Sequence, residues 1–272
     1  MSEVCNNDCG SCSADCADRD MRLAPNDKSN VKKVIGVVSG KGGVGKSMVT
    51  SLLAVAASRG GSRTAILDAD ITGPSIAQIF NIHGMASVTP DGLLLPSASE
   101  AGVKVMSINL LLENETDPVV WRGAMISGVL GQFWTEVAWG DVDVMFIDMP
   151  PGTGDVPLTV FQSLPVDGLV VVTSPQEMVR MIVEKAVRMA GLMDVPVIGI
   201  VENMSYFVCP NCGEKHRIFG ESHVQQIADS YAIGTVEELP LESSWAALCD
   251  KGQIEQIREV PLQKLSEVIR HL

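Results

Sequence analysis

The feature that most constrains this chain is a glycine-rich loop at residues 40–47, which reads Gly-Lys-Gly-Gly-Val-Gly-Lys-Ser and fits the pattern G-x-x-x-x-G-K-[ST]. The apolar run Val34–Val38 precedes it, and a helical pattern from Lys46 to Ser58 follows it. In a strand–loop–helix unit of this kind, backbone N–H groups close around phosphate oxygens and the helix N-terminus adds partial positive charge. The sequence therefore predicts a nucleotide-binding P-loop.

Each position of this loop has an expected role. We expect Lys46 to reach the β- and γ-phosphates of ATP and the Ser47 hydroxyl to ligate Mg²⁺. The remaining contacts to the nucleotide are predicted to come from Gly40, Lys41, Gly42, Gly43, Val44 and Gly45.

A second motif supports a nucleotide triphosphate site. Val144–Asp148 is a hydrophobic run that ends in a carboxylate, which is the Walker B pattern. Asp148 is expected to hold Mg²⁺ through water. The loop Pro150–Asp155 follows directly and is predicted to sense the γ-phosphate.

A pair of carboxylates closes another apolar run, at Asp68-Ala69-Asp70. We predict that Asp70 orients the attacking water and that Asp68 lies nearer the magnesium. For Asp68 an alternative stays open, because an aspartate in this position can instead cap the helix expected near Pro74.

Short apolar runs alternate with helical patterns along most of the chain, which predicts an α/β fold with a mostly parallel sheet and helices on both faces. Hydrophobic residues make up 46% of the chain and aromatic residues only 4%, so the core must be largely aliphatic. Further strands are expected at 64–67, 103–108, 144–147, 169–173 and 197–201, and further helices at 120–137, 156–163 and 178–192. We expect one P-loop ATPase domain over residues 31–272.

The apolar pattern breaks after Glu202. Residues 206–219 are expected to form a loop that carries Cys209 and Cys212. A helix near 221–231, a short strand and a closing helix near 261–272 complete the predicted domain.

The net charge of −13, without any Lys/Arg run, argues against nucleic acid and against an anionic membrane surface as partners. No apolar stretch is long enough to span a bilayer, and no signal peptide is visible, so a cytoplasmic location is expected. Cysteines in that compartment bind metal more often than they form disulfides.

These motifs together resemble the Mrp/ApbC iron–sulfur cluster carriers, a branch of the MinD/ParA class. Lys41 gives the loop the deviant Walker A form of that class. Within the class, the resemblance rests on the segments 68–75 (DADITGPS), 121–123 (WRG), 148–155 (DMPPGTGD) and 202–205 (ENMS), and it covers roughly residues 33–272.

The resemblance implies a homodimer in which Lys41 reaches the partner's nucleotide and Asn203 reads the adenine edge. It further implies that each chain gives Cys209 and Cys212 to one [4Fe–4S] cluster shared across the dimer. The implied activity is modest ATP hydrolysis coupled to assembly of iron–sulfur clusters and their transfer to apoproteins.

The cysteine pair also fits a different metal. Two thiolates do not complete a tetrahedral set, and His216 follows Cys212 at a plausible ligand spacing, so a structural zinc site is the alternative. A MinD/ParA-like positioning ATPase with such a zinc site is the competing function.

Residues 1–30 are polar, rich in cysteine and without apolar periodicity, and are expected to form a flexible tail. The four tail cysteines have the spacing C-x₃-C-x₂-C-x₃-C and are candidates for a second cluster or for zinc: Cys5, Cys9, Cys12 and Cys16. Cys249 is expected to be a small core residue.

Overall fold

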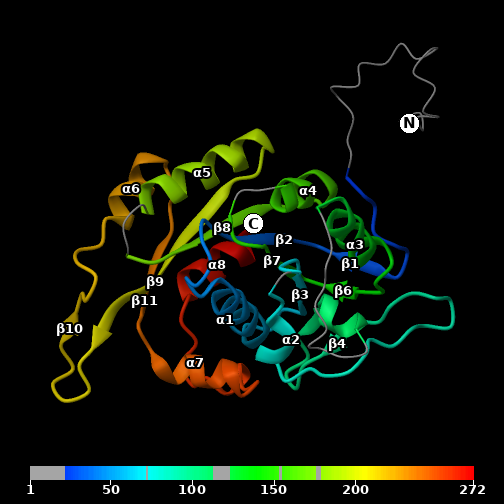
Figure 1. The fold of residues 1–272 in the computed structure, drawn as a ribbon, viewed down its shortest axis with the longest axis horizontal. Helices are drawn as coiled ribbons and strands as arrows, with labels where there is room; N and C mark the ends of the chain where they lie inside the picture. The colour runs from blue at the N-terminus through cyan, green and yellow to red at the C-terminus, as the bar shows by residue number, and fades with distance from the viewer. Residues whose placement is uncertain (1–21, 72, 113–122, 153–154, 176–178) are drawn as a thin grey trace, which may run out of the picture.

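A mostly parallel sheet forms the centre of the molecule (Figure 1), and the computed structural model describes residues 22–71, 73–112, 123–152, 155–175 and 179–272. Within this part of the chain the sheet has nine strands in the order β10-β9-β8-β2-β7-β3-β5-β4, with β11 also pairing with β9. The strands are β2 (Val34–Ser39), β3 (Thr64–Asp68), β4 (Ser97–Ala98), β5 (Lys104–Met106), β7 (Val144–Asp148), β8 (Gly168–Thr173), β9 (Val197–Val208), β10 (Lys215–His216) and β11 (Val236–Pro240).

Only β4 and β10 run antiparallel to their neighbours in this sheet. A separate parallel pair joins β1 (Ser29–Val31) to β6 (Gly140–Val142). The helices are α1 (Lys46–Arg59), α2 (Ile76–Ile79), α3 (Gly123–Thr135), α4 (Asp155–Ser163), α5 (Val179–Leu192), α6 (Val224–Ser230), α7 (Ser243–Asp250) and α8 (Gln263–His271), with short 3₁₀ turns η2 (Ile108–Leu111) and η3 (Ile254–Gln256).

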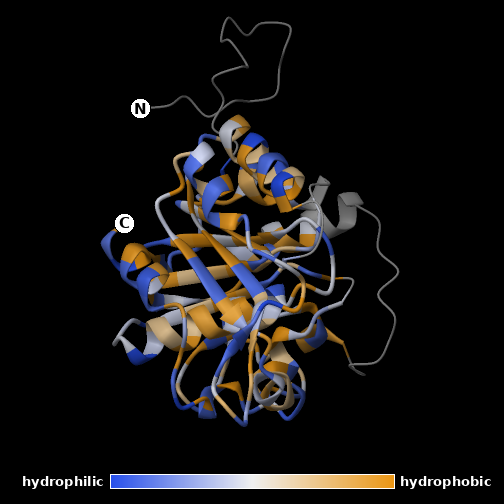
Figure 2. Ribbon diagram, turned by 90° about the vertical axis from the view of Figure 1, so that its left-hand side faces the viewer, coloured by the Kyte–Doolittle hydropathy of each residue, from blue (hydrophilic) through white to orange (hydrophobic). Residues whose placement is uncertain are grey.

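The helices cover both faces of the sheet, as the sequence predicts. Successive side chains of a strand point to opposite faces, so Val34 and Val38 of β2 join one apolar cluster while Ile35 and Val37 join the other. The first cluster packs against α3, α4, α5 and α6, and the second against α1, α2, α7 and α8. The apolar strands lie between these helical layers (Figure 2).

The α/β fold class predicted from the sequence is confirmed, and most predicted elements lie within a few residues of their observed bounds. The main difference lies at the cysteine segment. The sequence predicts a loop over residues 206–219, but β9 continues through Val208 and pairs with β10, so the cysteine segment forms the turn of a β-hairpin. The polar side chains that break the apolar pattern are buried by contacts with other elements, which a pattern of single residues does not reveal.

The described chain joins the domain before the expected boundary at residue 31. The Leu23 N–H donates to the Ser163 carbonyl, and Trp134 Nε1 donates to the Leu23 carbonyl, both at 2.7–2.8 Å. Asn26 Nδ2 donates to the carbonyls of Thr135 and Val137. Residues 22–30 therefore pack on the domain, and the tail cysteines at 5, 9, 12 and 16 lie outside the described residues.

Among the helices that the structure describes, none combines the length and the apolar character needed to cross a membrane.

Candidate nucleotide site and cysteine hairpin

The P-loop connects β2 to α1, and its backbone requires glycine at two positions. Gly43 and Gly45 adopt φ angles of +81° and +83°. This region of backbone conformation is energetically unfavourable for L-residues that carry a side chain. A Cβ atom on Gly45 would also overlap the amide nitrogen of Asn203. The loop is thus shaped both by its own backbone and by a residue of β9.

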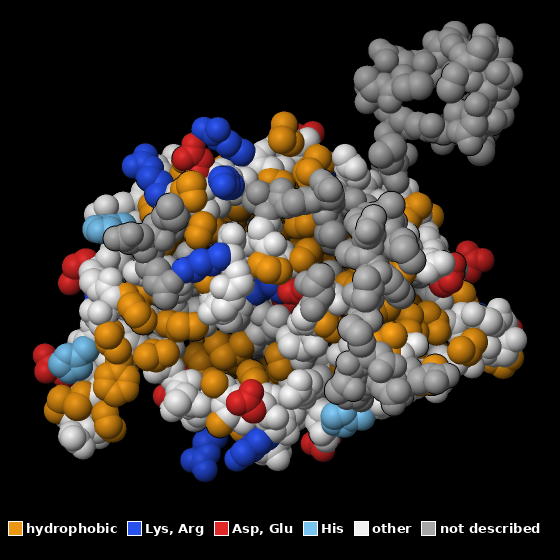
Figure 3. All heavy atoms as spheres, viewed as in Figure 1, with side chains coloured by type: hydrophobic (Ala, Val, Ile, Leu, Met, Phe, Trp, Pro, Cys, Tyr) orange, Lys and Arg blue, Asp and Glu red, His pale blue; other side chains and the backbone are white. Residues whose placement is uncertain are grey.

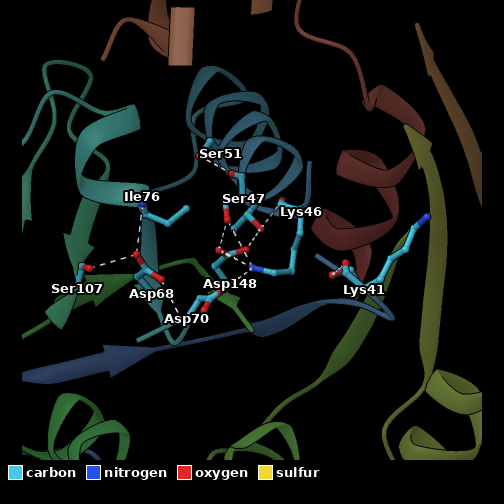
Figure 4. A network of polar contacts seen from close by, with 11 residues as sticks. Lys41, Lys46, Ser47, Ser51, Asp68, Asp70, Ile76, Ser107 and Asp148 are labelled. Carbon is cyan, nitrogen blue, oxygen red and sulfur yellow. Dashed lines mark hydrogen bonds and ion pairs between the residues drawn. The ribbon is translucent and has the colours of Figure 1, made fainter. Parts of the chain in front are cut away.

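Three polar side chains of α1 converge on Asp148, at the end of β7 (Figure 4). Lys46 Nζ lies 2.7 Å from Asp148 Oδ2, and the Ser47 hydroxyl donates to the same oxygen at 2.6 Å. Thr50 Oγ1 donates to Asp148 Oδ1 at 2.7 Å. Because Asp148 is fully buried, this cluster fixes the Walker B carboxylate next to the P-loop serine.

Asp68 makes the contacts of a helix cap. Its carboxylate accepts hydrogen bonds from the N–H groups of Ile76, at the start of α2, and of Asp70, and from the Ser107 hydroxyl at 3.1 Å (Figure 4). Burial, followed by the nearby Asp148 carboxylate, raises the pKa of Asp68 to about 8, with Lys46 opposing the shift. The hydrogen bond from the Ile76 N–H thus supports the capping alternative for Asp68. Asp68 and Asp148 are both fully buried.

Asp70 lies at the open side of the same cluster. Its Oδ2 is 3.8 Å from Lys46 Nζ, its side chain is 13% exposed, and it lines the cavity beside the P-loop. Of the two carboxylates, Asp70 lines this cavity and Asp68 does not.

A cavity of about 780 Å³ extends from the P-loop to the end of β11 and α7. Asn203 lines it, donates Nδ2 to the P-loop carbonyl of Val44 at 2.9 Å, and keeps a buried Oδ1 without a hydrogen-bond partner among the described atoms. That oxygen can accept a hydrogen bond from a base amino group. The opposite wall is formed by residues from Pro240 to Asp250.

Lys41 stands apart from this cluster. Its side chain points away from Lys46 and Asp148 (Figure 4). Within one chain it therefore lies outside the group of side chains that surrounds the Walker B carboxylate.

The cysteine hairpin is a tight turn between β9 and β10. The Cys209 N–H donates to the Glu214 carbonyl at 2.9 Å, and the Gly213 N–H donates to the Cys209 carbonyl at 2.8 Å. Sγ of Cys209, Sγ of Cys212 and a ring nitrogen of His216 lie within 4.8 Å of one another. Hydrogen bonds from the N–H groups of Cys212 and Asn211 lower the pKa of the Cys209 thiol, which favours the thiolate that binds metal.

Apolar side chains surround this turn. Phe207, Val208, Ile218 and Phe219 are 36–57% exposed, and the hydrophobic side chains gather on the hairpin at the lower left of Figure 3. These four side chains give the hairpin a partly exposed apolar surface next to the two thiols.

Polar contacts tie the base of the hairpin to the sheet. Arg217 Nη2 lies 2.7 Å from Glu238 Oε2 of β11, and Nη1 donates to the Ser205 hydroxyl at 3.1 Å. That hydroxyl donates to Glu202 Oε2 at 2.6 Å. The Glu238 carboxylate raises the pKa of Arg217, so the guanidinium stays charged.

Several of these residues escape prediction from the sequence. Thr50 could have been found, since it lies one helical turn after Lys46 on the same face of α1. No local motif marks Ser107, Arg217 or the Pro240–Asp250 wall. Only the folded structure brings these residues close to the two sites.

Cys249 lines the nucleotide cavity but is 9% exposed, and burial raises the pKa of its thiol to about 11. It packs with the second apolar cluster, as expected of a small core residue.

Comparison with known proteins agrees with this architecture. A ParA family model described as NUBPL iron-transfer P-loop NTPase matches residues 30–272. An iron-sulfur cluster carrier protein from Clostridium perfringens is 45% identical over 244 residues, covering 87% of this chain and 86% of the relative. The iron-sulfur cluster transfer protein NUBPL of Mus musculus is 40% identical, covering 82% of this chain and 70% of its own length.

Solved structures give the same picture. A nucleotide-binding protein from Archaeoglobus fulgidus in complex with ADP superposes with a TM-score of 0.78 at 44% identity, covering 86% of this chain and 91% of that one. A MinC:MinD complex from Aquifex aeolicus, at 17% identity and a TM-score of 0.56 over 88% and 94% of the two chains, shares the fold alone. Since the family match extends over nearly the whole domain, the chain belongs to the NUBPL iron-transfer P-loop NTPase family.

Proposed function

We propose that this protein is an ATP-hydrolysing carrier that assembles iron–sulfur clusters and transfers them to apoproteins. The observation that carries the proposal is that strand β9 bears Asn203, which lines the cavity beside the P-loop, and leads directly into the turn that carries Cys209 and Cys212. In this proposal one strand therefore links the nucleotide site to the metal site. The names of the iron-sulfur cluster carrier relatives support this reading.

The donor set beside the P-loop fits Mg²⁺. The Ser47 hydroxyl and the Asp148 carboxylate are hard oxygen ligands held 2.6 Å apart. Bound Mg²⁺ would neutralise charge on the β- and γ-phosphates. In this proposal Lys46 leaves Asp148 for the phosphates, Asp70 orients the attacking water, and Asp68 keeps α2 and the Asp70 backbone in position.

The cysteine turn fits a cluster shared by two chains. Each turn offers two thiols at a partly exposed tip, whereas a [4Fe–4S] cluster takes four thiolates. A homodimer that brings two turns together supplies the full set. It would also cover the apolar side chains around each turn and allow Lys41 to reach the partner's nucleotide.

The remaining features are consistent with a carrier. Exposed thiols stay reduced in a reducing compartment, which supports a cytoplasmic location. The net charge of −13 does not favour nucleic acid or membrane surfaces as partners. We assign the tail cysteines Cys5, Cys9, Cys12 and Cys16 to a second metal or cluster site. A positioning ATPase with purely structural zinc is not favoured, because the relatives with this domain carry iron–sulfur carrier names.

Anaerobic reconstitution with iron and sulfide tests the proposal. The wild-type chain should take up a cluster, dimerise and restore an iron–sulfur apoenzyme, whereas Cys209→Ala and Cys212→Ala should lose the bridging cluster and the transfer but keep ATP binding. Lys46→Ala should show the reverse, since it removes the positive charge at the phosphates and leaves the thiols intact. A chain lacking residues 1–21 should keep the bridging cluster but contain less iron. Wild-type protein that takes up no iron under these conditions would overturn the assignment.

A further inference from the structure

The hairpin places three metal-binding side chains on one surface of a single chain. His216 of β10 lies opposite Phe207 of β9, and Cys209 follows Phe207 by two residues. Cross-strand partners share a face of the hairpin. Cys209 begins the turn that follows β9, and this turn brings Cys209 and Cys212 close to His216.

The spacing of these atoms suits one small ion. Zinc binds thiolate at about 2.3 Å and imidazole at about 2.0 Å in a tetrahedron, so its ligand atoms lie roughly 3.5–3.8 Å apart. The two sulfur atoms and the imidazole nitrogen all lie within 4.8 Å of one another, a limit that is about 1 Å wider than the ligand spacing around one such ion. Two thiolates and one imidazole form a ligand set that zinc-class divalent ions accept.

We propose that His216 is a third metal ligand and that one chain alone holds a single divalent ion of the zinc class through Cys209, Cys212 and His216. Binding releases the two thiol protons and leaves the fourth coordination position to water. Cys212 and His216 are exposed, so this position faces solvent.

This site differs from a shared cluster in its stoichiometry. The mononuclear ion needs one chain, whereas the bridging cluster needs the thiolates of two. The two cargoes therefore compete for Cys209 and Cys212, and the metal supplied decides whether the hairpin acts in a monomer or in a dimer. Only this competition rests on the proposed function, because the ion site itself follows from the three side chains.

Cobalt(II) is a suitable probe, since its absorption reports both tetrahedral geometry and thiolate ligation. The titration uses the full-length chain with Cys5, Cys9, Cys12 and Cys16 replaced by serine, reduced and without oxygen, so that the tail does not compete. We expect one Co²⁺ per chain, a monomer by light scattering, intense tetrahedral d–d bands, and displacement of the cobalt by zinc.

The variants then identify the third ligand. His216→Ala should weaken cobalt binding by at least about 10-fold, since even outer-shell partners of a metal ligand contribute 10–100-fold, and should change the d–d bands. His216→Cys should restore tetrahedral binding with an added thiolate band. His271→Ala, which removes an exposed histidine of α8, is the matched control and should titrate like the parent.

Two results would overturn the proposal: an unchanged cobalt affinity and spectrum in His216→Ala, or saturation at one Co²⁺ per two chains. Iron and sulfide reconstitution of the same variant reports separately on the carrier function. A His216→Ala chain that assembles the cluster but has lost the cobalt site supports both the ion site and the carrier function. A His216→Ala chain that binds cobalt normally contradicts the ion site, and if it also assembles no cluster it gives no support to the carrier function.

Discussion

Glu202 and Asn203 are consecutive residues of β9, and their side chains point to opposite faces of the sheet. Asn203 donates to the Val44 carbonyl of the P-loop at 2.9 Å. Glu202 accepts from Ser205, which in turn accepts from Arg217 at the base of the hairpin. A single peptide unit therefore separates the contact to the P-loop from the polar network at the base of the cysteine hairpin.

Arg217→Ala should loosen the hairpin without affecting the nucleotide site. The arginine is about a third exposed, so its contacts should contribute only about 0.5–1.5 kcal/mol to global stability. Hydrogen exchange of the amides of residues 206–217 should nevertheless become faster, while ATP affinity stays the same. Arg188→Ala, which removes an exposed i,i+4 pair with Glu184, is the control. Equal exchange in both variants would show that the network does not hold the turn.

Asp70→Ala should separate ATP binding from hydrolysis. The carboxylate lies at the open side of the site, so its loss leaves the P-loop contacts intact but removes the group predicted to orient water. We expect turnover to fall by about 10²-fold or more with little change in ATP affinity. Rates come from phosphate release and affinities from calorimetry.

Asp68→Ala provides the contrast. It removes an acceptor from the Ile76 and Asp70 N–H groups and from Ser107, and should lower the free energy of unfolding by roughly 1–3 kcal/mol. Asp70→Ala should show no such loss in a urea titration. If Asp68→Ala were as stable as the wild type, the capping role would be wrong.

Gly45→Ala should damage nucleotide binding through the backbone. Alanine would have to adopt a φ of +83° and would push against Asn203. Strain of about 1–3 kcal/mol corresponds to a loss of ATP affinity of roughly 5- to 150-fold. Gly191→Ala in α5, where a Cβ meets nothing within 4 Å and φ is not positive, should bind ATP normally.

Cys249 should be the least reactive thiol of the described chain. Its pKa of about 11, against an ordinary value of 9.0, leaves about 100-fold less thiolate at pH 8. Iodoacetamide labelling followed by mass spectrometry should therefore modify Cys209 and Cys212 first. The rate at Cys249 should rise as the pH approaches 11, because a raised pKa delays ionisation to higher pH. Rapid labelling of Cys249 at pH 8 would contradict the burial of this side chain.

The sequence predicts those parts of the site that depend on local patterns. The P-loop and the strand that ends at Asp148 combine a fixed spacing with an apolar run, and the structure brings Lys46, Ser47 and Asp148 together as expected. The contacts of Asp68 could not be chosen from sequence, because a carboxylate at a strand end suits both a metal and a helix cap.

The hairpin shows why the rest could not be predicted. Glu202, Asn203 and Ser205 interrupt the apolar pattern of β9, and a polar interruption normally ends a buried strand. Their burial depends on Arg217, the P-loop and β11, all distant in sequence. The sequence does not predict helix α7 for a similar reason, since most of its residues are exposed and only Cys249 is buried.

Strand β9 continues beyond its pairing with β8, so the cysteine turn lies outside the parallel part of the sheet. Because side chains alternate along paired strands, the register that places His216 opposite Phe207 determines which face of the hairpin His216 occupies. An insertion of one residue that shifts this register would turn the histidine away from the thiols, whereas a shift of two would keep the parity. Changes that shift the register by an even number of residues should therefore keep His216 on its present face and leave the P-loop unchanged.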